Sequence, residues 1–120
     1  MQRQGRGVII NMSSGAGLIG APMMAAYSAS KHGVIGLTRT AAQEYIASGI
    51  RINAICPGGV DTPMLDSLLP GEMRDSIAAQ HFQRRFATPE EVADMVLFAC
   101  SDAASYSTGV EFKVNGGAFF

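Results

Sequence analysis

Residues 7–12 read GVIINM and residues 50–55 read IRINAI. Each is a short run rich in β-branched residues and bounded by turn-forming residues, which is typical of a buried strand. Between them, residues 24–47 are rich in alanine, leucine, lysine, glutamine and glutamate, and this composition favours one long helix that ends near Gly49. A strand, a helix and a second strand in this order predict a right-handed βαβ unit in a parallel sheet.

The second half of the chain predicts a long excursion, a further helix and a further strand. Residues 61–87 show no clean helical period, and we expect one or two short helices there. A longer helix begins after Thr88, because Thr88 can cap its first turn and Glu91 completes a capping box. That helix is expected to run to about Ser101 and to precede a last strand at 110–114. The fold class is therefore α/β, with about three parallel strands and long crossover helices.

Composition places the chain among small globular proteins. Its 120 residues fit one domain, and 48% hydrophobic with 16% charged residues argue against disorder. Nine basic and ten acidic residues leave no basic stripe, so we expect no nucleic-acid partner. The apolar run at 8–10 is too short for a signal peptide or a membrane span. We therefore expect a cytoplasmic protein without a membrane partner.

Residue types that bind metals are scattered along the chain. Cys56 and Cys100 lie far apart and outside any CxxC spacing, which indicates two reduced thiols. His32 and His81 have no neighbouring cluster of ligand residues. We expect no metal site.

Residues 15–20 read GAGLIG and match the G-x-G-x-x-G pattern of a dinucleotide-binding turn. In such a turn the helix opens within the glycine motif, and a carboxylate ends the next strand. Here Pro22 follows almost at once, and the next strand ends at Cys56 and Pro57 without an acid. We favour a flexible glycine loop beside an active site, and nucleotide binding by these glycines is the alternative.

Tyr27 and Lys31 are four residues apart on the predicted long helix, so their side chains start from neighbouring positions. A free tyrosine has a pKa of about 10 and is a poor base near neutral pH. An ammonium about 5 Å away, at an effective dielectric near 20, would favour the phenolate by about 3 kcal/mol, or about two pKa units. A shift of that size suits a general acid/base. The same spacing is also common on ordinary solvated helix faces.

Polar groups that follow two predicted strands are expected near this pair. Ser13 and Ser14 follow the first strand, and Pro57 with Gly58 ends the second. The carboxyl ends of parallel strands lie at one edge of a sheet, where open α/β sheets bind ligands. A serine hydroxyl at this edge could donate to a substrate carbonyl oxygen.

Several segments together resemble successive motifs of the short-chain dehydrogenase/reductase family. They read NMSS (11–14), YSASK (27–31), NAICPG (53–58), STG (107–109) and VNGG (114–117). In the last of these, aspartate is more usual in the family than Asn115. The match runs in order over essentially the whole chain, taken as one domain, 1–120. It implies the C-terminal portion of a Rossmann-like parallel sheet, with the N-terminal nucleotide-binding half absent.

The resemblance implies a role for each matching residue. Tyr27 is expected to give a proton to a carbonyl oxygen in reduction, or to take one from an alcohol in oxidation. Lys31 is expected to lower the pKa of Tyr27 and to hold the nicotinamide ribose hydroxyls. Ser14, with Ser13 as the runner-up, is expected to orient the substrate oxygen. The residues expected to bind NAD or NADP are Tyr27, Lys31, Pro57, Gly58, Val60 and Thr62.

These roles predict an NAD(P)-dependent oxidoreductase that transfers hydride between the cofactor and a small-molecule alcohol or ketone. Residues 61–87 would form a mobile substrate-binding loop with an apolar lid. The glycine-rich turn that begins family members does not occur before Met1, so we expect little or no turnover by the isolated chain. We also expect a homo-oligomer. The alternative is a non-catalytic remnant or interaction module that cannot bind cofactor.

Overall fold

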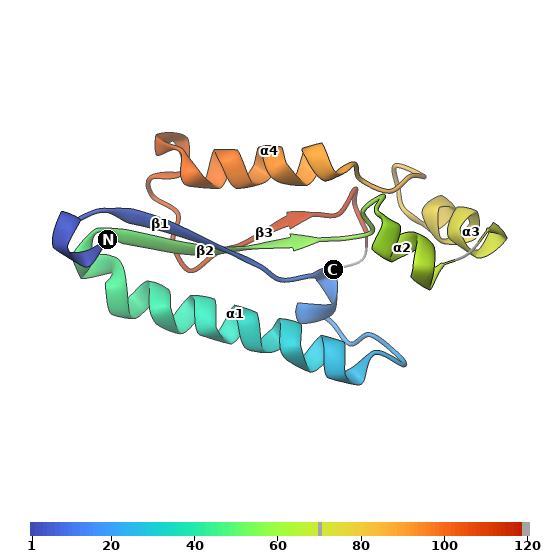
Figure 1. The fold of residues 1–120 in the computed structure, drawn as a ribbon, viewed down its shortest axis with the longest axis horizontal. Coiled ribbons are helices and arrows are strands. Elements are labelled where there is room, and N and C mark those ends of the chain that lie inside the picture. Colours follow the sequence, from blue (N-terminus) through green and yellow to red (C-terminus); the bar gives the residue numbers. More distant parts are fainter. Residues whose placement is uncertain (70, 119–120) are drawn as a thin grey trace.

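The computed structural model describes residues 1–69 and 71–118 and has three layers (Figure 1). A sheet of three parallel strands lies in the middle, and one long helix covers each of its faces. This is a Rossmann-like α/β arrangement, so the predicted fold class is confirmed.

The strands are β1 (Gly7–Met12), β2 (Ile50–Pro57) and β3 (Glu111–Val114), in the order β1-β2-β3. β2 is buried along most of its length, because it has a neighbour on each side and a helix on each face. β1 runs level with β2, with Met12 opposite Ile55. The two strands therefore deliver the segments that follow them to the same edge of the sheet.

The two long helices are α1 (Ala25–Tyr45) and α4 (Pro89–Cys100). α1 covers one face of the sheet and α4 covers the other (Figure 1). The buried residues of α1 are Ile35, Thr38 and Ala42, whose spacing of three and four residues puts them on one side of the helix. The rest of α1 is largely exposed.

The start of α4 follows the sequence prediction closely. The Thr88 hydroxyl accepts from the Glu91 backbone N–H at 3.3 Å, and the Glu91 carboxylate accepts from the Thr88 N–H at 2.8 Å. This reciprocal pair is the predicted capping box. Further along α4, Val92 and Ala99 pack around Ile55 of the central strand.

The excursion between β2 and α4 contains two short helices, as predicted. They are α2 (Pro63–Leu68) and α3 (Glu72–Gln80), and both project beyond the end of the sheet at which β2 and β3 finish (Figure 1). The 3-10 helices of the described residues are η1 (Gln2–Gln4), η2 (Gly15–Gly17), η3 (Ile46–Ser48) and η4 (Asp102–Ala104).

Two polar side chains of β2 fix the segment that leads into β3. Asn53 is fully buried; its amide donates to the Ser107 carbonyl at 2.9 Å and its oxygen accepts from the Val110 N–H at 3.1 Å. The Arg51 guanidinium donates to several carbonyl oxygens at and after the end of α4. Its acceptors are the carbonyls of Ala99, Cys100, Ser101, Ala104 and Ser107. Carbonyls at a helix C-terminus lack partners within the helix, so Arg51 supplies them.

Candidate active site

The serine pair lies where β1 and β2 both end. The Ser13 N–H donates to the Ile55 carbonyl at 2.8 Å and so continues the pairing of the two strands by one residue. Ser14 then caps η2, because its hydroxyl oxygen accepts from the Ala16 N–H at 3.2 Å. Pro57 ends the neighbouring strand. The edge predicted from the strand pattern is therefore formed.

The glycine segment 15–20 begins with the 3-10 helix η2, which covers Gly15–Gly17. Gly15 and Gly17 are buried within η2, where they pack against the start of α1. α1 begins only at Ala25, well after Gly20. A dinucleotide-binding turn requires the helix to open within the glycine motif, and here it does not. Burial against a helix turn explains these glycines better than contact with a phosphate.

A pocket of about 200 Å³ opens beside Ser14. Three predicted site residues, Ser14, Pro57 and Gly58, line it together. Tyr27 and Lys31 are not among its lining residues. The remaining lining residues are Gly15, Ala16, Ile19, Gly20, Ala21, Gly59 and His81.

His81 is the lining residue that sequence reasoning missed. It lies just beyond α3 and reaches the pocket from the excursion, while Ser14 reaches it from the end of β1. Its Nδ1 lies 3.0 Å from the Ile77 carbonyl, and its ring meets the Phe86 ring edge-on at 5.4 Å between centroids. No local pattern marks this position, because only the path of the excursion brings it near Ser14.

Tyr27 and Lys31 lie on the first turns of α1 and face each other as the spacing predicts. The Lys31 ammonium nitrogen is 5.5 Å from the centroid of the Tyr27 ring. It also donates to the Met12 carbonyl at 3.1 Å, at the end of β1. The Tyr27 side chain remains open to solvent, with 38% of its surface exposed. A phenol and an ammonium therefore stand together beside the edge at which β1 ends.

Val60 and Thr62 follow the glycines that end β2. Val60 forms a single parallel bridge to Ala87, at the far end of the excursion. The Thr62 hydroxyl caps α2 by accepting from the Leu65 N–H at 3.4 Å. This hydroxyl also lies 3.4 Å from the Val60 carbonyl, which it faces as a donor.

Cys56 lies beneath the serine pair and is fully buried, whereas Cys100 is exposed. Both thiols are free, as predicted. Burial raises the pKa of the Cys56 thiol, and a hydrogen bond with the Ser13 side chain opposes that effect. The thiol is therefore held in its neutral form at physiological pH.

The described part of the chain has neither a metal-binding cluster nor a helix that could cross a membrane. Within residues 1–69 and 71–118, no group of three or more His, Cys, Asp or Glu residues is placed to hold a metal ion. No helix in those same ranges combines the length and the apolar character that a membrane crossing needs.

Known proteins place this geometry in a family. A family model described as enoyl-(acyl carrier protein) reductase matches residues 1–118. A short-chain dehydrogenase of Hypocrea virens is 43% identical over 114 residues, which cover 93% of this chain and 46% of that protein. The chain belongs to the short-chain dehydrogenase/reductase family. The family resemblance of the sequence motifs is thereby confirmed.

Other members of the short-chain dehydrogenase/reductase family agree with this assignment. The cis-4-hydroxycyclohexanecarboxylate dehydrogenase of Sinomonas cyclohexanicum is 47% identical over 117 residues, covering 98% of this chain and 47% of that enzyme. The crystal structure of a protein from Beutenbergia cavernae, assigned as an NAD(P)-dependent gluconate 5-dehydrogenase and holding NADP, superposes with a TM-score of 0.93 at 40% identity. That superposition covers 98% of this chain and 47% of the other. The chain spans about half the length of these relatives.

Proposed function

We propose that this chain carries the catalytic residues of an NAD- or NADP-dependent oxidoreductase acting on an alcohol/carbonyl pair. The observation that carries the proposal is the Lys31 ammonium beside the Tyr27 ring, next to the strand edge that presents Ser14. Dehydrogenases and reductases among the relatives, and the NADP held by the Beutenbergia cavernae protein, support it.

Tyr27 is the proton donor in reduction and the proton acceptor in oxidation. Its side chain is exposed enough to meet a substrate oxygen, and the Lys31 ammonium lies beside its ring. The hydride itself is supplied or accepted by the nicotinamide ring when the cofactor is bound.

Ser14 orients the substrate oxygen, and the structure favours it over Ser13 for this task. The Ser14 oxygen accepts from the Ala16 N–H, and its hydroxyl proton has no acceptor among the described residues, so it can donate to a substrate carbonyl. Ser13 is only 5% exposed, and its hydroxyl already donates to the Lys31 carbonyl. Of these two serines, Ser14 lines the pocket and Ser13 does not.

The residues present fit the nicotinamide end of the cofactor. The Lys31 ammonium has three N–H donors and gives one to the Met12 carbonyl, which leaves two for the vicinal hydroxyls of a ribose. Pro57 and Gly58 offer backbone with little side-chain bulk at the pocket wall, which suits a flat ring. We assign Val60 and Thr62, which follow this wall, to the same end of the cofactor.

The excursion at 61–87 is the segment that we propose closes over the substrate. Its helices α2 and α3 project past the sheet, and several large apolar side chains of the excursion are exposed, which suits a segment that packs onto a substrate. These exposed residues are Met64, Leu68, Met73 and Phe82.

The oligomeric state and cellular location are also part of the proposal. Gly33 and Gly36 lie on the exposed side of α1, and apart from the neighbouring backbone of α1 no described atom lies within 4 Å of where a Cβ would be, which leaves room for another helix. We propose that a second copy packs there to give a homo-oligomer. Two free thiols suit the reducing conditions of the cytoplasm.

Activity is best tested in a chimera, because the chain spans half the length of its relatives. Residues 1–120 would replace the matching half of the Sinomonas cyclohexanicum enzyme. Oxidation of NADH and NADPH would then be followed with a panel of small ketones. We expect turnover by the chimera and little or none by residues 1–120 alone. A folded chimera without turnover or saturable cofactor binding would instead support a non-catalytic module.

A further inference from the structure

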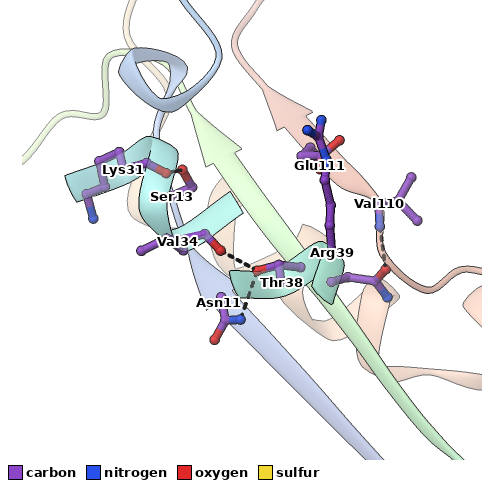
Figure 2. A network of polar contacts seen from close by, with 9 residues as sticks. Asn11, Ser13, Lys31, Val34, Thr38, Arg39, Val110 and Glu111 are labelled. Carbon is purple, nitrogen blue, oxygen red and sulfur yellow. Dashed lines mark hydrogen bonds and ion pairs between the residues drawn. The ribbon is translucent and has the colours of Figure 1, made fainter. Parts of the chain in front are cut away.

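Three side-chain hydrogen bonds join the segment after β1 to the first turns of α1. The Ser13 hydroxyl donates to the Lys31 carbonyl at 2.9 Å, and the Ser28 hydroxyl donates to the Ala16 carbonyl at 2.8 Å. The third is the bond from the Lys31 ammonium to the Met12 carbonyl. Figure 2 shows the Ser13 side chain directed at the main chain of Lys31. The two segments are thus tied at three separate points.

Each tie lies on, or directly beside, a residue of the proposed chemistry. Ser13 precedes Ser14, and Ser28 follows Tyr27. Lys31 takes part in two of the three ties, one through its carbonyl and one through its ammonium. Loss of any of these three hydrogen bonds would therefore shift the nearest reacting group.

Burial makes the Ser13 tie costly to break. Ser13 is 5% exposed, so a hydroxyl that lost the Lys31 carbonyl would stay inside the protein. A buried polar group that loses its hydrogen-bond partner is destabilising, because no water replaces that partner.

Gly17 permits this close approach. A Cβ built on Gly17 would lie 2.5 Å from the Ser13 hydroxyl oxygen and 2.7 Å from the Lys31 carbonyl oxygen. Any side chain there would push the segment away from the helix. Part of the GAGLIG motif is therefore explained by packing of η2 against α1.

Farther along α1, the helix is held to β1 itself. Asn11 donates from its side-chain amide to the Thr38 hydroxyl at 2.9 Å, and Thr38 donates to the Val34 carbonyl at 2.8 Å (Figure 2). This anchor fixes the middle of the helix. The first turns are held separately, by the hydrogen bonds of Ser13, Ser28 and Lys31.

We propose that Ser13 and Ser28 are positioning residues, which hold Ser14 at a fixed place relative to Tyr27 and Lys31. Neither hydroxyl needs to touch substrate or cofactor. Together they lock the serine segment onto the helix turns that carry the phenol and the ammonium. The consequence for catalysis rests on the proposed function, whereas the lock itself does not.

Ser28 gives the cleaner test, because it is only partly buried and its loss should leave the chain folded. Ser28→Ala removes the tie, and Ser28→Thr keeps a hydroxyl. Ser30→Ala is the matched control, since the Ser30 hydroxyl donates to the Tyr27 carbonyl of its own helix at 2.7 Å and not to the serine segment.

The lock is measured first without any activity, by amide hydrogen exchange of the 120-residue chain. We expect exchange in residues 14–18 to be about tenfold faster in Ser28→Ala, unchanged in Ser30→Ala and restored in Ser28→Thr, with the amides of β2 unaffected. Equal exchange rates of residues 14–18 in Ser28→Ala and Ser30→Ala would show that Ser28 does not hold this segment to α1.

The catalytic consequence is measured in the chimera. We expect Ser28→Ala to lower kcat about tenfold or more while the KM values for cofactor and ketone change less than about twofold, because misplacement costs rate rather than binding. Ser28→Thr should recover most of the rate. Equal kcat in Ser28→Ala and Ser30→Ala refutes the positioning role. A chimera that is inactive without any substitution refutes the proposed function. Hydrogen exchange would still show whether Ser28 holds the segment after β1 to α1.

Discussion

The ammonium nitrogen of Lys31 lies 5.5 Å from the centroid of the Tyr27 ring, one helical turn along α1. It is held there from a second side, because it donates to the Met12 carbonyl at the end of β1. The proposed acid/base pair therefore has two contacts that set the position of its charge, one with the phenol ring and one with β1.

Replacing Lys31 should damage both chemistry and cofactor binding. In the chimera, we expect Lys31→Met to lower kcat about a hundredfold and to raise the cofactor KM, because one ammonium serves the phenol and the ribose. Lys31→Arg should rescue little, since a planar guanidinium does not replace a compact ammonium. Lys113→Met, on an exposed residue of β3, is the control. Steady-state kinetics of the variants measure these effects. An unchanged kcat in Lys31→Met would contradict the role assigned to Lys31.

Gly17 and Gly20 belong to the same GAGLIG motif but should respond differently to alanine. A Cβ on Gly17 would overlap Ser13 and the Lys31 carbonyl, whereas a Cβ on Gly20 meets nothing within 4 Å. We expect Gly17→Ala to lower the free energy of unfolding by about 1–3 kcal/mol, as overpacking does. Gly20→Ala should cost well under about 1 kcal/mol.

Urea unfolding of the two variants measures the difference. Equal stability of Gly17→Ala and Gly20→Ala would show that packing does not explain the motif. Loss of nucleotide binding in both variants, without loss of stability, would revive the dinucleotide-binding alternative.

Glu91 should make the stability of the chain depend on pH in the acid range. A hydrogen bond from the Arg85 guanidinium, helped by the Thr88 N–H, lowers the pKa of Glu91 from 4.5 to about 2. The folded state therefore prefers the ionised carboxylate, and this contribution is fully present above pH 4.5. It is lost as the pH falls from about 4.5 to about 2.

Urea midpoints of the unsubstituted chain and Glu91→Gln should therefore differ most above pH 5 and converge toward pH 2. The gap should narrow in high salt, because the pair is exposed. Glu90→Gln, at the neighbouring position, is the matched control. A gap between the unsubstituted chain and Glu91→Gln that stays constant from pH 6 to pH 2 would contradict the assigned pair.

Arg51 should matter more for stability than an ordinary surface arginine. Its guanidinium supplies carbonyls at the end of α4 and before β3, and a single ammonium cannot reach them all. We expect Arg51→Lys to lower the free energy of unfolding by about 2 kcal/mol, the scale of a charged hydrogen bond. Arg39→Lys, at an exposed ion pair with Glu111, should cost less than about 1 kcal/mol. Urea unfolding of the two variants checks the order, and equal losses would contradict it.

Features with local causes could be predicted from the sequence. The capping box of Thr88 and Glu91 depends on residues three positions apart and was found as expected. The same holds for the pairing of Tyr27 with Lys31, which follows from helical periodicity alone. Parallel pairing of the strands also followed, because short β-branched runs joined by long helices favour βαβ units.

Features that depend on distant contacts could not be predicted. Ser13 meets the Lys31 carbonyl across 18 positions, and Arg51 meets the carbonyls after α4 across about 50. No periodicity encodes such meetings. The burial of Gly15 and Gly17 is of the same kind, since it comes from the packing of α1 against η2. His81 reaches the pocket through an irregular excursion, which no short pattern describes.

We propose that the Tyr27 phenol moves the proton during hydride transfer, and Tyr27→Phe in the chimera tests this claim. Tyr45→Phe, at the other end of the same helix and similarly exposed, is the matched control. With cofactor and ketone saturating, we predict that Tyr27→Phe loses at least about a hundredfold in kcat while still binding cofactor, and that Tyr45→Phe keeps full activity. Equal kcat in the two variants would contradict the claim.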